Sequence, residues 1–64
     1  MDKKELQELL ILRGWSRTRL AAELDISENA VQKWFMAGRV PGGPATILLR
    51  EWLAKAREEE HAHA

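Results

Sequence analysis

Side chains that can hydrogen-bond to DNA bases gather on one side of the segment 28–36. At 100° per residue, Asn29, Gln32 and Lys33 share one side of a helix with Glu28 and Met36, and the other side is apolar. In the major groove, Asn and Gln pair with adenine, Lys donates to guanine and Glu accepts from cytosine. An ordinary surface helix shows the same division but more often carries only Glu and Lys. The two amides therefore favour base recognition.

No comparable set of residues in the sequence is suited to catalysis or to metal binding. The chain has no cysteine, and its two histidines, His61 and His63, lie among the last four residues. Side chains two residues apart do not converge from a helix. Ser16, Thr18 and Ser27 have no histidine near them in the sequence that would act as an activating base. We therefore expect no enzymatic activity, no cofactor, no metal site and no small-molecule substrate.

Four helices are predicted from residues that begin or end helices. Asp2, Ser16 and Ser27 are suitable N-cap residues, and Gly14 and Gly38 are suitable stops. The segment 40–44 is predicted to be a loop, because its two prolines and two glycines interrupt a helix. No strand pattern is found, so we expect an all-α domain. The predicted helices are Lys3–Arg13, Arg17–Leu24, Glu28 to Met36 or Ala37, and Ala45 to about Glu59.

Apolar residues at helical spacing give each predicted helix a side for the core. Trp34 and Trp52 are assigned to this core, and Trp15 to a contact that staples the start of the next helix. Ile11 falls opposite the leucines of its helix and is either an ordinary exposed residue or part of a contact. The predicted stripes comprise Leu6, Leu9 and Leu10; Leu20, Ala21 and Leu24; and Leu48, Leu49, Trp52, Leu53 and Ala56.

The two middle helices form a pattern of their own. Ala21 is a small residue at the centre of the first, Asp25 and Ile26 form a tight turn, and Val31 is apolar at the centre of the second. A small residue is needed where two helices cross closely. With these positions in register, residues 16–34 resemble the Cro and lambda-repressor family of helix-turn-helix proteins. Residues 30–39 are particularly similar to phage Cro and its prophage and antitoxin relatives.

The resemblance implies a compact four-helix domain of the lambda-repressor type over residues 1–60. Residues 16–38 are then the helix-turn-helix unit, and residues 61–64 are expected to be a frayed tail. The implied function is a sequence-specific transcriptional regulator, a Cro-like repressor that binds a palindromic operator in double-stranded DNA as a homodimer. The implied base-contacting residues are Glu28, Asn29, Gln32 and Lys33. The implied phosphate-contacting residues are Arg17, Thr18, Ser27 and Arg39.

The sequence departs from the family pattern at three places. Asp25 stands where the turn usually has glycine, and Asp tolerates the left-handed conformation better than most residues. Arg17 replaces the usual Gln, which keeps a phosphate contact but changes its geometry. The C-terminal segment is predicted to be a helix rather than the strands of the best-known Cro, so the strand-mediated dimer of that protein does not carry over.

Size and charge leave two functions open. A chain of 64 residues gains stability from association, and Ile47, Trp52 and Leu53 on the last helix are the expected dimer contacts. The formal net charge is zero, whereas DNA-binding domains are often basic. This charge, with Glu28 and Met36 on the outer side of the third helix, is the basis of the alternative, a protein-interaction module that does not bind DNA.

No signal-peptide or membrane pattern is found, so a cytoplasmic protein is expected in a bacterium or phage-infected cell.

Overall fold

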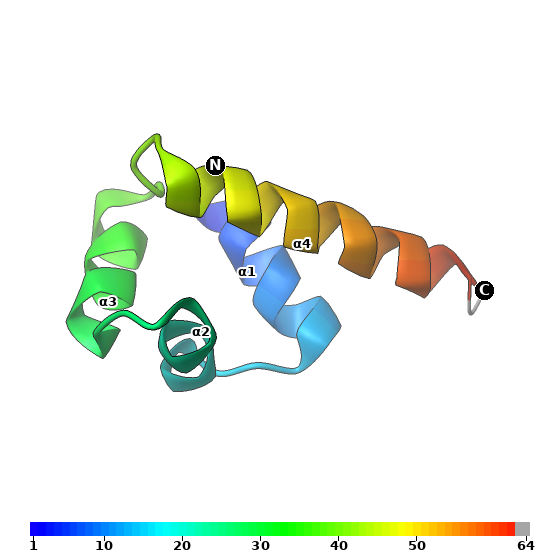
Figure 1. Ribbon diagram of the computed structural model, residues 1–64, viewed down its shortest axis with the longest axis horizontal. Helices are drawn as coiled ribbons and strands as arrows, with labels where there is room; N and C mark the ends of the chain where they lie inside the picture. The colour runs from blue at the N-terminus through cyan, green and yellow to red at the C-terminus, as the bar shows by residue number, and fades with distance from the viewer. Residues whose placement is uncertain (63–64) are drawn as a thin grey trace.

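A computed structural model describes residues 1–62 of the chain, and it is all-α (Figure 1). The helices are α1 (Lys3–Arg13), α2 (Arg17–Leu24), α3 (Glu28–Ala37) and α4 (Pro44–Ala62). The predicted all-α fold with four helices is thereby confirmed. None of the helices in residues 1–62 combines the length and apolar composition that crossing a membrane requires.

Local hydrogen bonds explain where the first three helices begin. Asp2 and Glu5 form a reciprocal capping box, in which the Glu5 amide donates to Asp2 Oδ1 over 2.9 Å and the Asp2 amide donates to Glu5 Oε1 over 3.3 Å. The hydroxyl of Ser16 caps α2, and that of Ser27 caps α3. Because each cap satisfies an amide that lacks a partner within its helix, these boundaries agree with the sequence prediction.

The ends of these helices adopt the left-handed conformation. Gly14 ends α1 at φ 69° and Gly38 ends α3 at φ 80°. Asp25 ends α2 at φ 56°, and it is the one residue other than glycine with a positive φ in the described chain. The turn between α2 and α3 therefore has a left-handed backbone at Asp25, at the cost of placing a Cβ in a crowded conformation.

The last helix is longer than predicted. It begins one residue earlier, at Pro44, and continues to Ala62 instead of ending near Glu59. The prediction of a frayed tail over 61–64 is therefore wrong for His61 and Ala62, and residues 63–64 lie outside the described chain. No glycine or proline follows Pro44, and ion pairs from α1 to Arg57 and Glu59 hold the later turns of α4.

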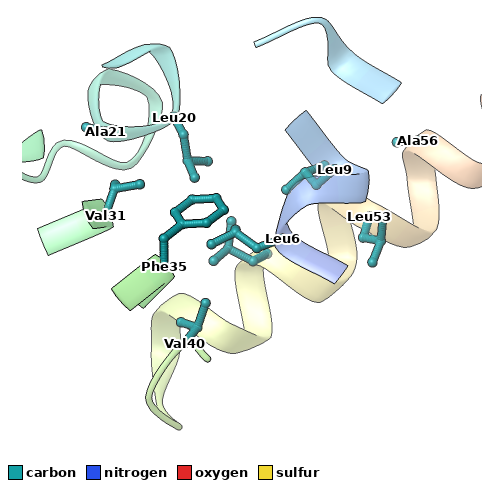
Figure 2. Packing of buried hydrophobic residues seen from close by; sticks show 10 residues of the cluster. Leu6, Leu9, Leu20, Ala21, Val31, Phe35, Val40, Leu53 and Ala56 are labelled. Atoms are coloured by element: carbon teal, nitrogen blue, oxygen red, sulfur yellow. The ribbon is translucent and has the colours of Figure 1, made fainter. Parts of the chain in front are cut away.

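One apolar core joins all four helices. Figure 2 shows the Phe35 ring of α3 directed toward Leu20 of α2 and Leu6 of α1, with Leu53 of α4 beside Leu9. Burial of these side chains supplies most of the favourable free energy of folding. The buried residues of the core are Leu6, Leu9, Leu20, Ala21, Val31, Phe35, Val40, Leu49, Leu53 and Ala56.

The helices pack mainly as two pairs, α1 with α4 and α2 with α3. The molecule measures 35 × 20 × 18 Å, and Figure 1 shows α2 and α3 at one end of the long axis, with the last turns of α4 at the other. The first residues are fastened to the segment after α3, since the Lys3 amide donates to the Gly38 carbonyl over 2.9 Å and the Val40 amide to the Met1 carbonyl over 2.8 Å. This connection fixes the C-terminal end of α3.

Candidate nucleic-acid interface

The close approach of α2 and α3 depends on the small and apolar residues that the sequence singled out. Ala21 and Val31 are both buried, and the Ile26 amide closes the turn by donating to the Ala21 carbonyl over 3.0 Å. The inner side of α3 is thereby held against α2 and the core. Its opposite side is left facing outward at one end of the molecule.

The outer side of α3 carries the four predicted base-contacting residues. Glu28, Asn29, Gln32 and Lys33 are all exposed, and Met36 continues this face with 80% of its surface exposed. Within residues 1–62, the side chains of Asn29, Gln32 and Lys33 take part in no hydrogen bond or ion pair. Their donors and acceptors are therefore free to meet a partner molecule.

The ion pairs of the protein lie away from this face. Arg57 on α4 binds Glu8 on α1 through two hydrogen bonds, of 2.7 and 2.8 Å. The hydrogen bond from Arg57 holds the pKa of Glu8 below its usual value. A second pair, Arg13 with Glu59, also joins α1 to α4, and a third lies within α2. Two of these pairs thus lie at the contact of α1 with α4 and one lies within α2, so none of them uses a side chain of α3.

An open groove of about 980 Å³ runs along α3 on the side away from α2. Three cations from three parts of the chain line it, namely Lys33 on α3, Arg39 after α3 and Arg50 on α4. None of the three belongs to an ion pair within the described chain. The capping carboxylates Asp2 and Glu5 also line the groove, and the backbone of Asp2 pairs with that of Arg39, so three cationic side chains share the groove with two carboxylates. A nucleic-acid backbone at α3 would meet these three cations.

Arg50 is the functional candidate that the sequence analysis did not name. It lies eleven residues beyond Arg39 and outside the helix-turn-helix unit, and no motif marks it. Only the packing of α4 against α1 brings it to the groove.

The predicted phosphate contacts Ser27 and Arg17 have different surroundings. Ser27 accepts a hydrogen bond from the Ala30 amide over 3.2 Å, so its hydroxyl proton remains available to a phosphate oxygen. Arg17 is exposed, and its guanidinium lies 4.1 Å from the centre of the Phe35 ring. This cation–π contact fixes Arg17 at the outer edge of the core.

Thr18 uses its proton within the protein. Its hydroxyl donates to the Glu28 carboxylate across the junction of α2 and α3. A hydroxyl has one proton to donate, so in this arrangement Thr18 is a partner of Glu28. Its phosphate contact stays a prediction that requires the hydroxyl to turn.

The three predicted dimer contacts do not form one surface. Leu53 is only 2% exposed and packs in the core, so its assignment to an interface is wrong. Ile47 is 63% exposed, and Trp52 is half-buried with its ring edge-on to Trp15 at a centroid distance of 5.8 Å. The reason is rotational: Ile47 and Leu53 are six residues apart, which places them on different sides of α4, and α1 covers the side with Leu53.

Trp34, Trp52 and the stripe residue Leu48 are less enclosed than predicted. Trp34 and Trp52 pack against the core but are only partly buried, and Trp34 also lines the groove. Leu48 is partly exposed beside Ile47, and Ile11 is exposed on α1.

No family model matches the chain, and no curated protein or solved structure matches it.

Within residues 1–62, no three His, Asp or Glu side chains are placed to hold a metal ion.

Proposed function

We propose that the protein is a sequence-specific DNA-binding transcriptional regulator that inserts α3 into the major groove. One observation carries the proposal: the outer side of α3 is exposed and presents two amides and an amine without partners, at one end of the molecule. These are the side-chain types that bind the edges of adenine and guanine. Bound over a promoter, such a protein acts as a repressor by occupying its operator.

The cations beside α3 supply the backbone contacts of this complex. Arg39 and Arg50 line the groove beside the base-contacting Lys33, and Ser27 offers a hydroxyl proton at the start of α3. Phosphate contacts set the register of a protein on DNA and give binding its dependence on salt. With few cations involved, the salt dependence is expected to be modest.

The protein binds a palindromic operator as a homodimer in this proposal. One short helix gives little specificity, whereas two copies contact half-sites about 34–36 Å apart, one turn of DNA. The exposed Ile47 and the partly exposed Leu48 at the start of α4 are the apolar residues available for the contact. Replacing Ile47 with Asp is expected to weaken self-association, measured by analytical ultracentrifugation with and without DNA.

The proposal is tested by selecting duplexes from a pool with a randomised centre and titrating the selected duplex against salt. Gln32→Ala is expected to weaken the free energy of binding to the selected duplex by about 1–3 kcal/mol and to relax the preference for one base pair. Arg39→Ala should weaken binding to all DNA sequences alike. It should also lower the slope of the logarithm of the binding constant against the logarithm of salt concentration by about 1. Lys55→Ala is the matched control, because Lys55 is an exposed cation outside the groove and outside the ion pairs of the described chain. Equal losses for Arg39→Ala and Lys55→Ala would contradict the placement of the DNA.

The exposure of Met36 favours a second candidate, a protein-interaction module. Its thioether lies near the C-terminal end of the outer side of α3, where an apolar partner would bury it. This function predicts that no duplex is enriched in the selection. It also predicts no salt-dependent binding to DNA and no effect of Gln32→Ala on it.

A further inference from the structure

Thr18 and Glu28 meet where α2 and α3 begin. They are ten residues apart in the sequence, both are exposed, and the Thr18 hydroxyl donates to Oε1 of Glu28. Glu28 is the first residue of α3, immediately after the Ser27 cap. In the proposed complex, this end of α3 is the part that enters the major groove, so the Glu28 carboxylate faces base edges there.

A carboxylate at this position discriminates strongly among bases. An ionised carboxylate can only accept hydrogen bonds. The Thr18 hydroxyl donates to Oε1 of Glu28, which leaves Oε2 free to accept from a base. Guanine and thymine present acceptor atoms to the major groove and therefore repel a carboxylate. Cytosine presents the amino group N4 as a donor, whereas adenine sets the acceptor N7 beside its amino group. Cytosine is thus the base that a fixed carboxylate accepts with the least repulsion.

Thr18 is suited to fixing this carboxylate. A free Glu side chain samples many rotamers, and ordering it on binding weakens the complex. Thr18 is β-branched and has only a few favoured rotamers about its first side-chain torsion, so donating to Glu28 costs its hydroxyl little conformational freedom. The contact orders Glu28 before DNA arrives.

We propose that Thr18 is a positioning residue that holds Glu28 for the amino group of a cytosine. The protein then selects cytosine at the base pair that faces the start of α3. This inference rests on the proposed function and adds to it one base, one reading residue and the residue that orients it.

The experiment is duplex selection followed by affinity titration of all four bases at each position of the selected site. The wild type is expected to prefer cytosine at one position by about fivefold or more. Glu28→Gln should move that preference to adenine, because an amide pairs with N6 and N7 of adenine. Thr18→Val should reduce the cytosine preference about two- to tenfold and leave the other positions unchanged. Thr18→Ser, which keeps the hydroxyl, should retain most of the preference.

Two controls separate positioning from folding. Ala22→Val places the same side chain at another exposed position of α2, and it is expected to change no base preference. Thermal unfolding of each variant reports whether the fold is retained. Because Thr18 and Glu28 are both exposed, all three substitutions are expected to leave the fold intact, and Glu28→Gln tests the base contact independently of Thr18→Val.

The outcomes distinguish this inference from the proposed function. If the wild type enriches no duplex, the proposed function fails and the inference fails with it. If the wild type enriches a sequence in which Glu28→Gln changes no position, only the inference is overturned. If Glu28→Gln removes a cytosine preference that Thr18→Val leaves intact, Glu28 contacts the base without Thr18, and the positioning role is overturned.

Discussion

Replacing Leu53 with alanine is expected to lower the free energy of unfolding by about 3 kcal/mol. The Leu53 side chain is 2% exposed, so the three carbons removed are lost from the core, at about 0.8 kcal/mol each. The remaining cavity adds to this loss, and measured Leu→Ala changes in cores cost about 2–5 kcal/mol. A domain of 64 residues has a total stability of about 3–10 kcal/mol. The variant is thus expected to be partly unfolded near the low end of that range.

Urea unfolding followed by tryptophan fluorescence measures the loss. The three tryptophans are all partly buried against the core, so their emission changes when the core opens. The matched control is Ile47→Ala on the same helix. Ile47 is 63% exposed, so its truncation is expected to change the stability of the monomer, measured at low protein concentration, by less than about 0.5 kcal/mol.

The burial of Leu53 would be refuted if Leu53→Ala lowered the free energy of unfolding by less than about 1 kcal/mol, or by no more than Ile47→Ala does. A second readout is protein concentration. Loss of a dimer contact lowers the unfolding midpoint by an amount that depends on protein concentration, whereas a core cavity in the monomer gives the same loss at every concentration.

Two further changes test the ion pair between α1 and α4 and the turn between α2 and α3. Arg57 lowers the pKa of Glu8, so this pair stabilises the fold above the ordinary titration range of Glu and stops doing so as the pH falls through the lowered pKa. Glu8→Gln should therefore lower the melting temperature near about pH 7 and have little effect near about pH 3. Glu58→Gln is the control, and an equal pH-dependent change there would contradict the assignment. At the turn, Asp25→Val should be less stable than Asp25→Gly by about 1–2 kcal/mol in urea unfolding, because Asp25 is left-handed. Equal stability would show that the turn has rearranged.

The boundaries of the first three helices were determined by the sequence alone. Caps such as Ser16 and Ser27, and stops such as Gly14 and Gly38, act on amides and carbonyls within a few residues. Local hydrogen bonding needs no knowledge of the rest of the fold. For the same reason, the division of α3 into an inner and an outer side was correct from spacing alone.

Contacts between distant segments were decided only by the tertiary structure. The sequence named both Leu53, on the apolar stripe of α4, and Ile47, outside that stripe, as interface residues, and only the packing of α1 on the stripe shows that Leu53 is enclosed within one chain. The same packing brings Arg50 to the groove. Likewise, Thr18 became the partner of Glu28 through the crossing of α2 and α3. Periodicity tells which residues share a side of a helix, but the neighbour of that side is set by how the whole chain buries its apolar surface.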